Sequence, residues 1–276
     1  MTTQHDSANL FHALHTPTTP LALANAWDAA SARLVESAGA RAIATTSAGV
    51  AWGLGAADGD HLDRDQAVAL IARVVNAVSV PVTADIESGF GATPAEVADT
   101  VARVIAAGAV GINIEDAHPD NLPALRPVAD QCERLAAARS AADAAGVPLF
   151  INARLDTYLR AIGPEETRLQ ETLDRARAYL DAGASGIFVP GVTDPDLIAA
   201  LTAGIPAPVN ILAGPGAPSV PELSKLGVAR VSLGSGVAEA AYAVARRAAA
   251  ELAATGTYTS LTDAIPYGDL NALMNR

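Results

Sequence analysis

The stretch TADIESGFG places two carboxylates, Asp85 and Glu87, at the end of an apolar run, and a third, Glu115, ends the run GINIE. Carboxylates that converge in a partly dry site repel one another unless they take up protons or neutralise a cation. A set of oxygen ligands without His or Cys suits Mg²⁺ or Mn²⁺. The sequence therefore predicts a divalent-metal site at these three residues, and the alternative is an ion-pair network with Arg154.

Arg154, in the segment INARLD, is the cation that we expect in the site. Its planar guanidinium matches a carboxylate group of a substrate. The alternative is a salt bridge from Arg154 to Glu115 or Asp156, and both arrangements can hold at once. His118 follows the segment GINIED and is either a general acid on a loop or a surface residue. Asn210, at the end of another apolar run, is a candidate substrate-binding residue.

Short apolar runs that alternate with Ala-rich helical segments must position these residues. Four of the runs follow a glycine that suits the left-handed turn at the end of a helix, and four begin with proline. The two kinds alternate strictly, and eight such units favour a closed (β/α)8 barrel over a doubly wound open sheet. The glycines are Gly39, Gly108, Gly183 and Gly227, and the prolines are Pro20, Pro81, Pro148 and Pro208.

A barrel of this kind places its active site at the carboxyl ends of the strands, where the polar residues above are found. No linker or shift in composition divides the chain, so we expect one barrel domain over residues 1–276. A long helix is predicted from about Gly236 to Ala254, and the sequence after it exceeds what one barrel needs. Such a tail usually packs on the barrel or on a neighbouring subunit, which favours a homo-oligomer.

The composition excludes several classes of partner. The chain is 50% hydrophobic and 17% charged, with a net charge of −12. An acidic surface disfavours nucleic acid and anionic membranes, because both are bound through basic patches. No apolar run approaches the roughly 20 residues of a membrane helix, and the N-terminus lacks the pattern of a signal peptide. A single cysteine, Cys132, rules out an internal disulfide, so we expect a cytoplasmic protein.

Lysine usage excludes one kind of chemistry. Lys225 is the only lysine of the chain, against 17 arginines. A Schiff-base aldolase needs a lysine at the carboxyl end of a strand, whereas Lys225 precedes the last predicted strand. Any carbanion that forms in this site would therefore need stabilisation by a metal ion.

These motifs resemble the isocitrate lyase/phosphoenolpyruvate mutase superfamily over nearly the whole chain. TADIESGFG is similar to the family's Asp-x-Asp-x-Gly-[FY]-Gly, and GINIED and INARLD also match. The resemblance implies a barrel with an additional helix that is exchanged between paired subunits in tetramers. It also implies a Mg²⁺ site, bound mostly through water, and a pyruvyl-binding segment that uses backbone amides. The matching positions are Asp85, Glu87 and Glu115 for Mg²⁺, Thr46, Ser47 and Ala48 for the amides, Asp58 for the acidic loop residue, and Arg154 for the substrate-facing arginine.

The sequence departs from the family pattern in three places. Glu87 replaces the second aspartate of the metal motif and is longer by one methylene. The loop after the fourth strand reads EDAHPDNLPALRP and lacks the Lys-[KR]-Cys-Gly-His segment of isocitrate and methylisocitrate lyases. The same loop also lacks the Lys-Thr-Asn-like segment of the phosphonate-cleaving and mutase members, which only Asn121 could echo.

The leading hypothesis is a Mg²⁺-dependent carbon–carbon bond lyase acting on a small 2-oxo or 2-hydroxy di- or tricarboxylate by retro-aldol cleavage, retro-Claisen cleavage or decarboxylation. Asp58 or His118 would then manage the proton. The first alternative is phosphorus–carbon bond chemistry of the phosphonopyruvate hydrolase or phosphoenolpyruvate mutase type, with Asp58 as nucleophile or base. The second is a barrel that binds a 2-oxo acid without turning it over.

Overall fold

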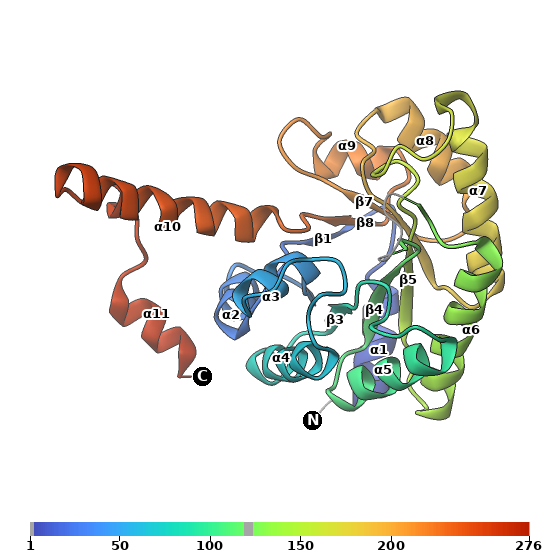
Figure 1. Cartoon of the computed structure of the whole chain (residues 1–276), viewed down its shortest axis with the longest axis horizontal. Coiled ribbons are helices and arrows are strands. Elements are labelled where there is room, and N and C mark those ends of the chain that lie inside the picture. The colour runs from blue at the N-terminus through green and yellow to red at the C-terminus, as the bar shows by residue number, and fades with distance from the viewer. Residues whose placement is uncertain (1–2, 119–123, 276) are drawn as a thin grey trace.

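The computed structural model describes residues 3–118 and 124–275, and these residues include eight parallel strands (Figure 1). Neighbours in sequence are neighbours in the sheet, and β1 pairs with β8, so the sheet curls round on itself. The remaining gap is bridged where Ala26 and Thr45 pair in parallel just beyond β1 and β2. This confirms the predicted (β/α)8 barrel. The strands are β1 (Leu21–Leu23), β2 (Ile43–Ala44), β3 (Val82–Asp85), β4 (Gly111–Glu115), β5 (Phe150–Arg154), β6 (Gly186–Val189), β7 (Val209–Leu212) and β8 (Arg230–Ser232).

Helices follow the strands and cover the outside of the barrel. Thr93 and Glu96 form a capping box at the start of α5 (Pro94–Ala106). The four predicted helix-ending glycines all have positive φ, from 85° at Gly227 to 107° at Gly183. The helices are α1 (Gln4–Ala13), α2 (Ala29–Ser37), α3 (Ser47–Gly53), α4 (Arg64–Ala77), α5 (Pro94–Ala106), α6 (Val128–Ala144), α7 (Glu165–Asp181), α8 (Pro195–Gly204), α9 (Val220–Lys225), α10 (Gly236–Thr255) and α11 (Tyr267–Met274), with a short 3₁₀ helix η2 (Thr259–Leu261).

Residues that point into the barrel form layers, because alternate residues of a strand face the same side. Gly111 pairs with Phe150, Asn113 with Asn152 and Glu115 with Arg154 in the register of β4 and β5. The middle layer is tied by Asn152 Nδ2, which donates to Asn113 Oδ1 at 2.9 Å. The uppermost layer therefore presents a carboxylate and a guanidinium at the carboxyl ends of the strands.

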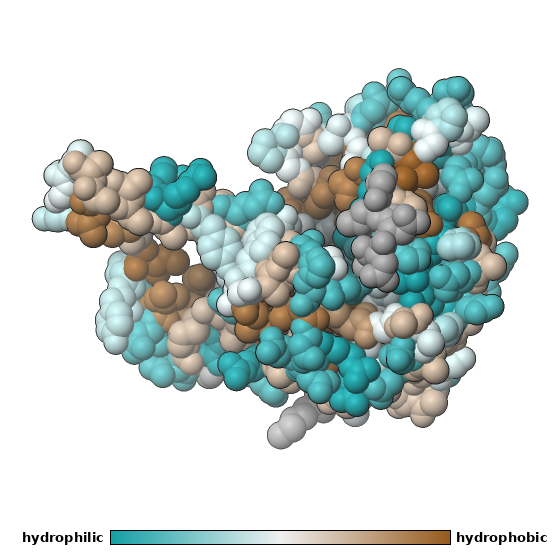
Figure 2. All heavy atoms as spheres, viewed as in Figure 1, coloured by the Kyte–Doolittle hydropathy of each residue, from teal (hydrophilic) through white to brown (hydrophobic). Residues whose placement is uncertain are grey.

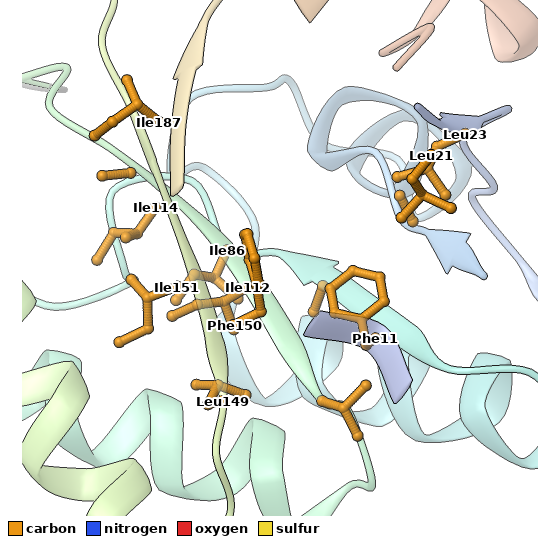
Figure 3. Packing of buried hydrophobic residues seen from close by; sticks show 14 of the residues in the cluster. Phe11, Leu21, Leu23, Ile86, Ile112, Ile114, Leu149, Phe150, Ile151 and Ile187 are labelled. Carbon is orange, nitrogen blue, oxygen red and sulfur yellow. The ribbon is translucent and has the colours of Figure 1, made fainter. Parts of the chain in front are cut away.

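Helix α1 closes the opposite end of the barrel. Its Phe11 is fully buried, and a side chain at Gly111 would meet the Phe11 ring at 2.7 Å. His15 stacks on Phe150 with ring centroids 3.9 Å apart. These residues belong to one apolar cluster that runs through the barrel and its helices, and Figure 3 labels several of its members, including Ile112 and Ile187.

The C-terminal segment leaves the barrel. Helix α10 begins next to β8 and runs outward, and the chain then turns back through η2 to α11 (Figure 1). Tyr242, near the start of α10, contacts Trp27 and Trp52 on the barrel. Farther along, Leu252 and Tyr258 are 61% and 73% exposed, and Figure 2 shows apolar atoms where α10 and α11 face each other. Among the described residues, no helix is both long enough and apolar enough to cross a membrane.

Candidate active site

Glu115 and Arg154 meet at the mouth of the barrel because the register of β4 and β5 places them side by side. Arg154 Nη1 lies 2.6 Å from Glu115 Oε2. Its Nε and Nη2 donate to the two oxygens of Asp156 at 2.6 and 3.0 Å. The ion-pair network that the sequence left as the alternative is therefore present around Glu115, and it holds the guanidinium in one orientation.

The charges of this network are balanced by burial and by contact. Burial lowers the pKa of Arg154, but Glu115 and Asp156 outweigh that effect and raise it, so the guanidinium stays charged. Burial raises the pKa of Glu115, Arg154 opposes that rise, and the negative charges of Asp156 and Asp85 add to it. Burial and the neighbouring carboxylates therefore disfavour the charged form of Glu115, and the ion pair with Arg154 favours it.

Arg160 is a second cation at the mouth, and sequence reasoning missed it. Its Nε donates to Asp156 Oδ2 at 2.9 Å, and its Nη2 lies 4.0 Å from Glu115 Oε1. The residue follows Asp156 by four positions on one helical turn, closed by the Arg160 N–H donating to the Asp156 carbonyl. An acid and a base four residues apart after a strand were the available signal.

Asp85 lies between β3 and the start of α3. Its carboxylate accepts the Ser47 N–H at 3.1 Å, and its own N–H donates to Thr45 Oγ1 at 2.8 Å. Burial raises the pKa of Asp85, and Arg154 and the Ser47 amide oppose that rise. The side chain is therefore fixed beside the segment that the sequence assigned to substrate binding.

Only part of that segment has free amides. The Thr46 N–H donates to the Ala26 carbonyl at 3.0 Å, as part of the ladder that closes the barrel. The Ser47 N–H already bonds to Asp85. In the described part of the chain, the Ala48 N–H has no acceptor, because it is one of the first amides of α3. Ala48 is thus the member of the trio with an available donor.

Glu87 turns toward the loop after β2. Its Oε2 accepts the N–H of Gly59 at 2.8 Å and also the N–H of Asp60. Its Oε1 is buried and has no partner among the described residues. Burial raises the pKa of Glu87 to about 8, and the charges of Asp60, Asp58 and Asp85 add to the rise, while the Asp60 amide opposes it.

Asp58 lies on the same loop and is exposed. Its negative charge raises the pKa of Asp85, Glu87 and Glu115, which places it within electrostatic reach of all three. A second contact, besides the one from Glu87, joins this loop to the segment after β3: Ser88 Oγ donates to an Asp60 carboxylate oxygen. The structure thus gathers Asp58, Asp85, Glu87 and Glu115 at one end of the barrel.

His118 and Asn210 complete the set of predicted residues. His118 is half-buried at the end of β4, and its Nδ1 is buried without a partner in the described part of the chain. Asn121, on the loop that follows, lies outside the described residues. Asn210 Oδ1 accepts from Ser232 Oγ at 3.2 Å, and its Nδ2 has no acceptor within residues 3–118 and 124–275. Asn210 therefore keeps one N–H group for a water molecule or a ligand.

Asp116 turns away from the mouth, although it follows Glu115 in the sequence. Its carboxylate accepts from the Tyr179 hydroxyl at 2.9 Å and from the Asp156 N–H at 3.0 Å. Arg175 Nη1 lies 3.4 Å from the same carboxylate. Burial raises the pKa of Asp116 to about 6, and these donors oppose the rise. This network joins β4, β5 and α7 beneath the site, and sequence reasoning missed both Arg175 and Tyr179.

The donor chemistry fits a hard divalent cation held largely through water. The carboxylates of Asp85, Glu87 and Glu115 supply only oxygen atoms, and one of them, Glu87 Oε1, is a buried oxygen without a partner in the described chain. Among the described residues, no group of three or more His, Cys, Asp or Glu side chains is gathered closely enough to hold a metal directly. A cation at these carboxylates would therefore be held largely through water molecules.

Comparison with known proteins places the chain among enzymes. Residues 11–253 match the sequence profile of phosphoenolpyruvate phosphomutase. An uncharacterized protein of Mycobacterium tuberculosis is 41% identical over 95% of both chains. The 2-methylisocitrate lyase of Escherichia coli is 34% identical over 69% of this chain and 64% of its own length. A putative lyase/mutase from Burkholderia cenocepacia, 42% identical, superposes with a TM-score of 0.91 over 99% of this chain and 97% of its own.

The matched region contains all eight strands and every candidate residue at the mouth of the barrel. The proteins similar to this chain include a lyase and a phosphomutase, so enzymatic activity is supported at that level. The chain therefore belongs to the phosphoenolpyruvate phosphomutase family, within the isocitrate lyase/phosphoenolpyruvate mutase superfamily that its motifs resemble.

Proposed function

We propose that this protein is a Mg²⁺-dependent lyase that cleaves a carbon–carbon bond in a small 2-oxo or 2-hydroxy di- or tricarboxylate. The observation that carries the proposal is the excess of buried carboxylate at the mouth of the barrel. Burial raises the pKa of Asp85, Glu87 and Glu115, the negative charge of Asp58 adds to each rise, and Arg154 forms an ion pair with Glu115. Such an excess is costly unless a cation joins it.

Mg²⁺ is the cation that suits these ligands, and Mn²⁺ would fit the same oxygen set. Asp85 and Glu115 flank the top of the barrel from β3 and β4, and Glu87 follows β3. We assign the ion to these carboxylates, mostly through water. When bound, it would supply electrostatic stabilisation for the negative charge of an enolate.

The chain's own groups bind and orient the substrate. Arg154, fixed by Glu115 and Asp156, presents the edge of its guanidinium to a substrate carboxylate, and Arg160 adds positive charge beside it. The Ala48 N–H and Asn210 Nδ2 are donors without an acceptor in the described part of the chain, so they are assigned to substrate oxygen atoms. Fixed donors of this kind lose little free energy to reorganisation.

Proton transfer falls to Asp58 and His118. In retro-aldol cleavage, a base removes the proton of the hydroxyl group while the carbon–carbon bond breaks and its electron pair passes to the enolate. An acid then returns a proton to the enolate carbon. Asp58, exposed on the loop after β2, suits the base, and His118, at the end of β4, suits the acid.

The similarity to 2-methylisocitrate lyase supports carbon–carbon cleavage. The match to the phosphomutase profile supports the second candidate, which is phosphorus–carbon chemistry on a phosphonopyruvate-like substrate. Inorganic phosphate released from phosphonopyruvate would identify the second candidate. Tight binding of an oxo acid without product from any candidate substrate would identify a binding protein instead.

Calorimetric titration with oxalate, a mimic of the pyruvate enolate, tests the shared premise. We expect oxalate to bind in the presence of Mg²⁺ and not after EDTA is added. Binding of this kind justifies a screen of 2-oxo and 2-hydroxy dicarboxylates for cleavage. If oxalate binds in neither condition, the carboxylates serve another purpose and the proposed function is wrong.

A second copy of this chain is the partner that the tail fits best. An apolar groove of 540 Å³ lies on the outside of β1 and β8, between α2 and α9. In a (β/α)8 barrel this place belongs to the helix that follows the last strand. Helix α10 leaves that place and points outward instead (Figure 1). If two copies exchanged α10, the helix of each copy would cover the groove of the other, and the apolar residues of both tails would be buried.

The groove offers a matched pair of variants for testing this assembly. Ala38 lines the groove, whereas its neighbour Ser37 does not. We expect sedimentation velocity to show an oligomer for the wild type and for Ser37→Arg, and a smaller species for Ala38→Arg. A monomeric wild type would contradict the exchange.

A further inference from the structure

Two short loops meet beside the candidate active site in an unusual backbone conformation. Asp60, on the loop after β2, and Glu87, directly after β3, have φ values of 60° and 51°. Residues other than glycine avoid this left-handed region, at a cost of about 1–2 kcal/mol each. Both residues take up this conformation at the point where the two loops touch. The contact between them therefore compensates for local strain.

The backbone of Glu87 is anchored to the barrel. Its carbonyl accepts the Glu115 N–H at 2.9 Å, which extends the β3–β4 ladder beyond the end of β3. The side chain starts from this fixed point and reaches the other loop, where its Oε2 accepts the N–H groups of Gly59 and Asp60. One carboxylate oxygen thus joins the barrel wall to two consecutive amides of the loop.

These amides directly follow Asp58, the residue assigned to proton transfer. Asp58 itself is exposed, so no packing holds its side chain in place. One anchored oxygen atom that accepts two hydrogen bonds restrains both peptide units. Fixing Gly59 and Asp60 therefore fixes the direction in which the chain presents Asp58.

The length of the Glu87 side chain is what makes the contact possible. The Gly59 N–H lies 2.8 Å from Oε2, which is an ordinary hydrogen-bond length. An aspartate on the same backbone is shorter by one methylene, about 1.5 Å. Its oxygen atoms would fall short of both amides unless the backbone moved. The extra methylene at this position therefore has a structural consequence in this chain.

We infer that Glu87 is a positioning residue, whose carboxylate fixes the loop of Asp58 over the site, and that this contact rather than metal ligation is its main contribution. The inference rests on the proposed function only for the catalytic role of Asp58. The loop contact itself depends on the geometry of Glu87, Gly59 and Asp60 alone.

Two conservative variants of Glu87 separate the two roles. Glu87→Gln keeps the length and an acceptor oxygen for the loop amides but removes the charge that a metal ligand needs. Glu87→Asp keeps the charge but loses the reach. If Glu87 positions the loop, Glu87→Asp should be the more impaired variant. If Glu87 binds the metal, Glu87→Gln should be the more impaired one. Each variant is therefore the control for the other.

The first readout is hydrogen exchange of the Gly59 and Asp60 amides in the full chain, measured without Mg²⁺. We expect Glu87→Gln to exchange within about threefold of the wild type and Glu87→Asp to exchange at least about tenfold faster, because the shorter side chain loses both hydrogen bonds to the loop. Thermal unfolding of each variant checks that both are folded. Equal exchange of the two amides in all three proteins would overturn the inference.

The second readout is Mg²⁺ affinity, measured by calorimetry in the presence of oxalate. The inference predicts that Glu87→Gln keeps Mg²⁺ affinity within about threefold of the wild type. A loss of tenfold or more in Glu87→Gln, with normal affinity in Glu87→Asp, would show that Glu87 is a metal ligand and would overturn the inference. Should the wild type fail to bind Mg²⁺ and oxalate, the proposed function fails, and the hydrogen-exchange ranking still decides the loop contact.

Discussion

The two ends of the barrel bury different kinds of ionisable group. At the carboxyl ends of the strands, Asp85, Glu87 and Glu115 crowd together, and burial raises the pKa of all three. At the other end, Phe11 of α1 and His15, just after α1, seal the barrel. Burial lowers the pKa of His15 to about 3, so its imidazole is neutral at pH 7.

This difference assigns ligand binding to the upper end of the barrel and stability of the fold to the lower end. The lower end removes apolar surface from water and keeps its histidine uncharged, which stabilises the fold. The upper end buries carboxylates that a purely structural barrel would not need, because burial disfavours their charged form. Polar residues at the upper end of a (β/α)8 barrel are therefore the ones expected to act on ligands, whereas the lower end is expected to carry stability.

Asp85→Ala tests the upper end and should have the largest effect. The variant removes a carboxylate that faces Arg154 and the Ser47 amide, so we expect Mg²⁺-dependent oxalate binding to be lost and any turnover to fall at least about a hundredfold. The melting temperature should change little, because burial disfavours the charged form of the carboxylate that is removed. Glu133→Ala, an exposed site on α6, is the control. Normal turnover in Asp85→Ala would contradict the metal assignment.

Arg154→Met should reduce both binding and stability. It removes the 2.6 Å partner of Glu115 and leaves Asp156 with Arg160 alone, and a broken buried ion pair costs about 3–5 kcal/mol. Chemical denaturation measures the loss. Replacement of Arg160, whose side chain is more exposed, should cost less and serves as the comparison. Equal losses at the two positions would show that the network does not depend on Arg154.

Phe11→Ala tests the lower end alone. Phe11 is fully buried, and truncation of a buried phenylalanine costs about 3–5 kcal/mol. We expect a lower free energy of unfolding, with unchanged oxalate affinity in the protein that remains folded. A loss of oxalate affinity at temperatures well below unfolding would show that the two ends are coupled.

His15 makes stability depend on pH in a defined direction and with the smallest effect. Its pKa is about 3 in the folded protein, against 6.5 for a free histidine, so the unfolded chain binds the extra proton as pH falls below 6.5. Burial is the main cause, and the positive charges of Arg230 and His12 contribute. The histidine therefore destabilises the fold by roughly 1 kcal/mol more at pH 5.5 than at pH 6.5.

The variant His15→Phe should remove this contribution while keeping a ring against Phe150. We expect its free energy of unfolding to fall less steeply than that of the wild type between pH 6.5 and pH 5.5, by roughly 1 kcal/mol over the interval. Denaturation at several pH values gives both slopes. Parallel slopes would mean that the pKa of His15 is the same in the folded and the unfolded protein.

Much of the fold could be predicted because local signals repeat with the fold's own period. The four helix-ending glycines have the expected positive φ, and each of the four prolines lies one or two residues ahead of a strand. Those strands set the ends at which Asp85, Glu115 and Arg154 lie. The bend of Asp116 away from the site followed no local signal, because its partners on α7 are distant in sequence.

The sequence by itself determined the eight units of the barrel and the residues at their carboxyl ends, because strand and helix periodicities and turn residues act over short stretches of chain. Only the tertiary structure decided how those residues share their charges. Register joined Glu115 to Arg154, a helical turn brought Arg160 beside them, and two left-handed residues turned Glu87 toward the loop of Asp58. Apart from the local turn that brings Arg160 to Asp156, these pairings join segments that are far apart in the chain, and no spacing in the sequence encodes them.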